Sequence, residues 1–326
     1  MIADANSFWY FMKCWAECSR GLPISKKPEH MRTVFKRDKK NQAIPKISFR
    51  GEDRVTDRVK GAKVLKFLQD DLMPMTVEPP VERKELINLS TGDIAVKKIE
   101  DNSAEKSMKD ETELEISAFH FSEKMIRNLK ERAQASSSFV AVAAHFWKCV
   151  IEARNVPENQ TVHFQLFADC RDQLMRPLPL TYFGNCLCPG AAQTNANQLL
   201  EQDICFAAGV IQEVIISCKT EVQLNNFTEW IESRDLGNFN YLDSGYSVKV
   251  LNSPKFRVYN MDHGWGKPLN VQPASIDVIG GMFLLAGRDD GGRSIDLYTL
   301  LPLPHMETLK RILMVRAHSL ALPSRL

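Results

Sequence analysis

The chain has 326 residues, 44% of them hydrophobic and 25% charged, a composition typical of a globular protein that excludes a disordered or fibrous chain. The 42 Lys and Arg residues nearly balance the 40 Asp and Glu residues, and a net charge of +2 gives no basic surplus for binding nucleic acid. The eight cysteines include no Cys-x-x-Cys pair, so they predict buried thiols in a reducing compartment and neither a disulfide framework nor a metal site.

Targeting signals are sparse in this sequence. The longest apolar stretches, 139–144 and 278–286, are far shorter than the ~20 residues that span a bilayer, and the N-terminus has no basic run followed by an apolar block. We therefore expect a cytoplasmic protein without a membrane partner. The alternative is the peroxisome, because the last three residues, Ser324, Arg325 and Leu326, are similar to the Ser-Lys-Leu address.

The first predicted element is an amphipathic helix close to the N-terminus. Apolar residues recur at helical spacing from Phe8 to Trp15, and Gly21 follows the last turn as a C-cap would. Asn6 or Ser7 is expected to cap the free backbone N–H groups at its start.

Periodicity fades between about residues 26 and 115, where prolines recur and only 59–72 looks helical. Residues 90–115 are rich in Asp, Glu, Lys and Ser, which predicts a solvated loop. We therefore divide the chain into residues 1–30, a crossover connector at 31–113 with a charged loop, and a domain at 114–326.

From residue 114 the pattern alternates between the periods of strands and helices, which predicts an α/β fold. The expected strands are 114–121, 162–168, 246–251, 278–286 and 295–301. The expected helices begin at Ser122 and Ser137 and cover 199–218, 222–231 and 305–316. Two cysteine pairs are expected in the core: Cys14 and Cys18 on one helix face, and Cys186 and Cys188 on one strand face.

A turn with two glycines stands out near the C-terminus, in the run Asp262, His263, Gly264, Trp265 and Gly266. Taken alone, it predicts a local turn in which the glycines adopt positive φ, the aspartate accepts hydrogen bonds from the backbone, and the indole packs underneath.

Four segments together resemble the BAHD family of acyl-CoA-dependent acyltransferases, and the resemblance covers nearly the whole chain. They are 3–9 (ADANSFW), 136–154 (SSSF and AHFW), 169–185 (DCR, PLP and YFGN) and 253–266 (SPKF and DHGWG). The sequence of residues 253–259 resembles the family branch that includes plant cuticle acyltransferases more than it resembles the hydroxycinnamoyl transferases. The resemblance implies a two-domain, chloramphenicol-acetyltransferase-like α/β fold with mixed sheets, of which residues 1–30 are a remnant of an incomplete N-terminal half-domain.

The implied reaction is transfer of an acyl group from acyl-CoA, a co-substrate, to a small-molecule alcohol or amine, with no bound cofactor or metal and with a monomeric enzyme. The family's general base is the His of a His-x-x-x-Asp motif, because a neutral imidazole can accept a proton at pH 7. Asp4 matches the Asp of that motif, so the His would lie directly ahead of Met1. Two alternatives stay open: the sequence is incomplete at its front, or it is a remnant that binds coenzyme A esters or another protein.

The resemblance also implies roles for two acidic residues. Asp4 is expected to be structural and to pair with Arg171, which would hold the His-bearing turn; the alternative is two ordinary surface charges. Asp262 heads a turn that shapes the coenzyme A side from a distance, and it is also expected to be structural. His263 replaces the family's Phe, and it is not expected to serve as the base because this turn is remote from the channel.

For the phosphates of coenzyme A, the sequence suggests Ser136 and Ser137 at a helix N-terminus, with Arg132 nearby. Free N–H groups at the start of a helix suit an anion. The alternative is a plain N-cap without a ligand.

Overall fold

A computed structural model describes residues 3–30, 63–65, 113–173, 177–220, 246–288 and 290–321. The helix expected at 222–231, most of the connector at 31–113, and the C-terminal residues 324–326 lie outside these ranges. Within them, no helix is both long enough and apolar enough to cross a membrane.

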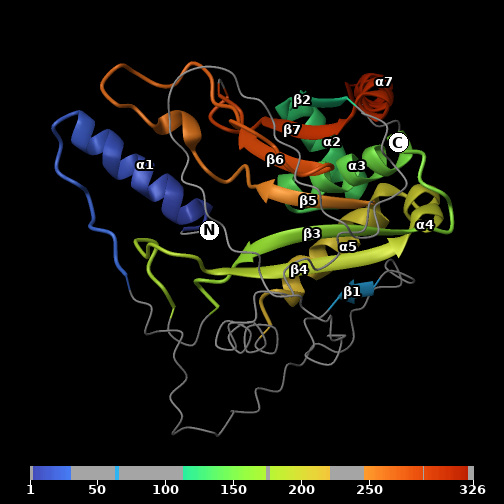
Figure 1. The fold of residues 1–326 in the computed structure, drawn as a ribbon, viewed down its shortest axis with the longest axis horizontal. Helices are drawn as coiled ribbons and strands as arrows, with labels where there is room; N and C mark the ends of the chain where they lie inside the picture. The colour runs from blue at the N-terminus through green and yellow to red at the C-terminus, as the bar shows by residue number, and fades with distance from the viewer. Residues whose placement is uncertain are drawn as a thin grey trace, which may run out of the picture.

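One mixed sheet forms the centre of the described structure. Its strands are β1 (Lys63–Leu65), β2 (Leu114–Phe121), β3 (Thr161–Asp169), β4 (Leu187–Asn195), β5 (Ser247–Asn252), β6 (Gly281–Ala286) and β7 (Ile295–Pro302). They lie in the order β1-β4-β3-β5-β6-β7-β2 (Figure 1). Strand β5 is parallel to both its neighbours, and the other pairs are antiparallel. The α/β prediction is confirmed, and the five expected strands are present, although β6 begins later than expected.

The helices of the described ranges are α1 (Ala5–Ser19), α2 (Glu123–Ala133), α3 (Ser138–Ala153), α4 (Ala196–Glu201), α5 (Ile204–Ser217) and α7 (Leu303–Ala321), with a 3-10 turn, η5 (Val258–Asn260). Figure 1 shows α2, α3 and α5 behind the sheet, whereas α1 lies apart from them. The N-cap predicted at Ser122 is confirmed, because its side chain accepts a hydrogen bond from the N–H of Met125.

Helix α3 is the centre of the core. Every residue from 140 to 151 is buried, and many of them are small or apolar, so that neighbouring elements can approach the helix closely on all sides. Helices α2, α5 and α7 pack against it. Toward the sheet, the ring of Trp147 lies 5.3 Å from the ring of Phe164 on β3. This packing fixes the position of the N-terminal end of α3.

The prediction of one continuous helix at 199–218 is wrong, because the chain forms two helices there, α4 and α5. The first ends at Glu201 with Gln202 as its C-cap, and Asp203 caps the second, since its side chain accepts a hydrogen bond from the N–H of Phe206 at 3.2 Å. The buried amino group of Lys148 on α3 donates to the carbonyls of Leu200 at 3.1 Å and Gln202 at 2.6 Å, which satisfies the free end of α4.

Two other expectations are corrected at the N-terminal side of the chain. The N-cap of α1 is Asp4, not Asn6 or Ser7, because the Asp4 carboxylate accepts the N–H of Ser7 at 3.0 Å. The segment 59–72, expected to be helical, contains the strand β1, which pairs with β4 at the sheet edge.

All eight cysteines are free thiols, and six of them are buried. Cys186 and Cys188 are in the core as predicted. Cys14 is buried too, but the prediction is wrong for Cys18, which is exposed one turn further along α1, near the end of the helix; Cys205 is only half-buried.

Helix α5 packs so closely on β4 that Gly190 has no room for a side chain. A Cβ there would lie 2.4 Å from Sγ of Cys218 and 2.7 Å from Cγ1 of Val214. We expect Gly190→Ala to lower the free energy of unfolding by about 2 kcal/mol through overpacking. Urea denaturation measures this change. Adding Cys218→Ala should restore part of the loss, and a Gly190→Ala protein as stable as the parent would contradict the packing.

Candidate active site

The turn before α1 is held by a buried ion pair. Asp4 is 0% exposed and Arg171 is 3% exposed, and Nη2 of Arg171 lies 2.8 Å from Oδ2 and 2.9 Å from Oδ1 of Asp4. The carboxylate also accepts the backbone N–H of Cys186 at 2.9 Å. The structure therefore brings together the two residues that the resemblance pairs, and it excludes the alternative of two surface charges.

Arg171 also binds a second carboxylate, that of Asp169, to which the sequence assigned no separate role. Its Nη1 lies 3.0 Å from Oδ1 of Asp169, the last residue of β3. Oδ2 of Asp169 accepts a hydrogen bond from Nδ2 of Asn6 on α1 and lies 3.3 Å from Nζ of Lys255. We call the series Asp4, Arg171, Asp169 and Lys255 the charge chain.

The charge chain affects the ionisation of Asp169. Burial alone would raise the pKa of this carboxyl, but the hydrogen bond and charge of Arg171, followed by the charge of Lys255, outweigh burial and lower the pKa below its ordinary value. Asp169 is therefore an anion at neutral pH. Within the charge chain, two negative groups alternate with two positive groups.

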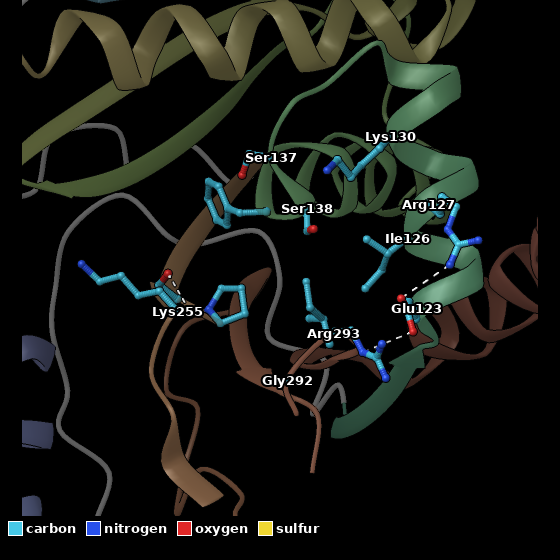
Figure 2. Close-up of a pocket in the computed structure, with 13 residues that line it drawn as sticks. Glu123, Ile126, Arg127, Lys130, Ser137, Ser138, Lys255, Gly292 and Arg293 are labelled. Carbon is cyan, nitrogen blue, oxygen red and sulfur yellow. Dashed lines mark hydrogen bonds and ion pairs between the residues drawn. The ribbon is translucent and has the colours of Figure 1, made fainter. Parts of the chain in front are cut away.

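The last residue of the charge chain lines a groove of about 670 Å³ between α2, the start of α3 and the loops after β5 and before β7. We call it the basic groove; its polar lining side chains include Glu123, Arg127, Lys130, Ser137, Ser138, Lys255 and Arg293 (Figure 2). Glu123 lies 3.5 Å from Arg127 and 3.4 Å from Arg293. Four basic side chains against one acidic side chain make this groove suited to an anionic ligand.

The proposed coenzyme A residues divide between two places. Ser137 is the N-cap of α3, makes no capping hydrogen bond with its side chain, and lines the basic groove. Ser136 lines an adjoining groove of about 440 Å³, which shares Arg127 and Lys130 with the first. Arg132 lines neither groove.

The four basic residues of the groove were not predicted from the sequence. Arg127 and Lys130 lie one helical turn apart on α2, and that spacing could have indicated them. Lys255 and Arg293 come from distant segments, so only the fold could place them beside α2.

The turn at 262–266 lies against the far end of α1. Oδ1 of Asp262 accepts the N–H groups of Gly264 at 2.7 Å and Gly266 at 2.9 Å, and these bonds lower the pKa of the carboxyl. Both glycines have positive φ, 107° and 92°. Trp265 is 94% exposed, so the expectation that its indole packs underneath the turn is wrong.

His263 finds its partners on α1. Its Nδ1 lies 3.3 Å from Oγ of Ser19, and the edge of its ring meets Trp15 with the ring centroids 5.4 Å apart. The length of α1 separates Ser19 from Asp4 by roughly 20 Å. His263 is therefore remote from the turn that the charge chain holds.

Two other histidines of the described structure have surroundings that differ from that turn. His145 is buried in α3, where burial and then the charge of Arg316 lower its pKa to about 3. His120 pairs with Asp296 across two strands, with 2.7 Å between Nδ1 and Oδ1. Within the described ranges, no group of three or more His, Cys, Asp or Glu side chains could hold a metal ion.

The buried pair gives a test of what holds the turn. Asp4→Asn should lower the free energy of unfolding by about 3 kcal/mol, because it leaves the charge of Arg171 buried with one carboxylate fewer. Lys310→Gln is the control: it breaks the exposed pair of Lys310 with Glu115, and an exposed pair contributes less than about 1 kcal/mol. Chemical denaturation of both variants measures the difference, and an Asp4→Asn protein as stable as the parent would contradict it.

Comparison with known proteins supplies the family. The chain matches a family model described as the Transferase family over residues 1–313. It is 30% identical to BAHD acyltransferase DCR of Arabidopsis thaliana over 94% of this chain, and 23% identical to a hydroxycinnamoyltransferase of Narcissus pseudonarcissus over 96%. The chain spans 56% and 64% of the lengths of these two relatives.

A solved structure agrees with the fold. TRI101 of F. graminearum, complexed with coenzyme A and T-2 mycotoxin, is similar with a TM-score of 0.64 and 14% identity, over 95% of this chain and 62% of that one. The two proteins therefore share the fold of this mixed sheet with its helices. From the family match, the relatives and the fold together, the chain belongs to the BAHD family of acyl-CoA-dependent acyltransferases.

Proposed function

We propose that this chain is the part of an acyltransferase that binds the phosphates of acyl-CoA and holds the turn next to the catalytic base. The observation that carries the proposal is the basic groove, which is lined by four basic residues together with the start of α3. Coenzyme A is a polyanion, and Arg and Lys side chains with helix N-terminal N–H groups are the usual partners of phosphate. The volume of about 670 Å³ falls in the range of ligand pockets.

The second part of the proposal concerns the turn before α1. In the whole protein we place the general-base His immediately ahead of residue 1, four positions before Asp4, as the resemblance implies. The buried pair with Arg171 supports this placement, because it fixes the direction in which the chain enters α1. Asp4 itself has its carboxylate occupied by Arg171, Ser7 and Cys186, so its role is to position the turn.

The proposed reaction follows from that arrangement. The imidazole takes the proton of an alcohol or amine while the acceptor atom attacks the thioester carbonyl. The carbon–sulfur bond then breaks, and the leaving thiolate of coenzyme A takes the proton back from the imidazolium. The products are the acylated acceptor and free coenzyme A, and no cofactor is consumed.

We propose plant specialised or cuticle metabolism as the setting, since the relatives above are plant enzymes, one of them named for hydroxycinnamoyl transfer. The acyl group and the acceptor are to be found by assaying the whole protein with a panel of acyl thioesters. A protein that binds coenzyme A without any transfer would favour the alternative of a non-catalytic binding module.

Charge in the basic groove provides the direct test. We expect Arg127→Gln and Lys130→Gln each to weaken coenzyme A binding about tenfold, because each removes a charge-assisted contact to phosphate. Isothermal titration calorimetry with coenzyme A measures the affinity, and repeating it at higher salt should reduce the difference. Lys310→Gln, which removes an exposed lysine outside the groove, is the control. Unchanged affinity in both groove variants would refute the proposal.

A further inference from the structure

We infer that Asp169 is a positioning residue that couples the basic groove to the first turn of α1, because its carboxylate and a bound phosphate compete for the amino group of Lys255. The inference rests on the proposed function, since it takes the groove as the phosphate site of coenzyme A. It adds a role for a carboxylate that touches neither the ligand nor the reacting atoms.

The position of the Lys255 amine is the first observation. The residue lines the basic groove, yet its Nζ lies 3.3 Å from Oδ2 of Asp169. Figure 2 shows the amine turned away from the other basic side chains of the groove. The side chain is 49% exposed, so its ion pair is solvated and can exchange for another partner. A phosphate in the groove would offer that partner.

The opposite side of Asp169 is the second observation. Its Oδ2 accepts a hydrogen bond from Asn6, which lies in the first turn of α1, two residues after Asp4. Its Oδ1 accepts two hydrogen bonds from Arg171, from the backbone N–H at 3.2 Å and from Nη1 at 3.0 Å. The carboxylate of Asp169 therefore connects Lys255 of the groove to Asn6 and Arg171, which hold the first turn of α1.

The consequence follows from electrostatics. When Lys255 moves to a phosphate, Asp169 loses one neutralising charge and becomes a stronger acceptor for Asn6 and Arg171. A filled groove thus tightens the first turn of α1, which adjoins the proposed base. By linkage, the same competition makes Asp169 reduce the affinity of the empty groove for coenzyme A.

Binding measurements on four proteins test the coupling: the parent, Asp169→Asn, Lys255→Gln and the double variant. Asp169→Asn frees the lysine, so we expect coenzyme A to bind roughly fivefold more tightly, at the low end of coupled sites. In the Lys255→Gln background the same substitution should change affinity less than twofold. Asp296→Asn is the matched control, because Asp296 and Asp169 both have side chains that are 24% exposed and pair with a basic residue.

Hydrogen exchange provides a second measurement that does not depend on the stability of Asp169→Asn. We expect coenzyme A to slow exchange at the N–H of Ser7 and Phe8 in the parent, and to leave it unchanged in Lys255→Gln. A purely structural Asp169 would produce neither this difference nor tighter binding. In the whole enzyme, Asp169→Asn should lower KM for acyl-CoA and also lower kcat.

The outcomes separate the two proposals. If Asp169→Asn weakens binding, or changes affinity equally with and without Lys255, the coupling is refuted while the groove remains the coenzyme A site. If the parent does not bind coenzyme A, or binds it without any effect of Arg127→Gln and Lys130→Gln, the proposed function fails and the coupling fails with it.

Discussion

A buried arginine shared by two carboxylates holds α1 to the rest of the molecule. Helix α1 buries few side chains, and Phe8, Phe11 and Trp15 are about half exposed along it. Its attachment at the first turn is polar, through Asp4 and Asn6, and these reach Arg171 and Asp169 at the end of β3. Because the cost of leaving the arginine buried and unpaired is large, this geometry resists displacement.

The same residues connect the end of the interior strand β3 to α1 and to the basic groove. Strand β3 delivers Asp169 and Arg171 on either side of the buried Cys170, where α1 begins and where the loop after β5 brings Lys255. Under the proposed function, binding of acyl-CoA in the groove and the orientation of the turn before α1 would share one set of charges. Asp169 connects the groove to this turn, because its carboxylate contacts both Lys255 and Asn6.

The sequence predicted what depends on local periodicity. Strands β2, β3, β5 and β7 follow alternating patterns and lie close to their expected bounds, and α3 begins at its predicted cap. The resemblance supplied the partnership of Asp4 and Arg171. The strand β1 was missed because an edge strand of three residues carries too little pattern. The break between α4 and α5 was missed because apolar residues on the two sides of the polar residues 201–203, such as Leu200 and Ile204, keep helical spacing.

The rest of the site depends on contacts between distant segments. Nothing in the sequence brings Lys255 and Arg293 beside α2, or Asp169 beside Asn6, until the sheet order does so. The contacts of His263, which stands where the family has Phe, also depend on the fold. Its partners Ser19 and Trp15 are on α1, more than two hundred residues earlier in the sequence.

The most direct test of this account is a double-mutant cycle between Asp4 and Arg171, measured as the free energy of unfolding of Asp4→Asn, Arg171→Met and the double variant. If the buried pair anchors α1, the double variant should be more stable than the sum of the two single losses predicts, with a coupling of about 2 kcal/mol or more. Additive losses would show that the two residues act independently, and the central role given to their pairing would then be wrong.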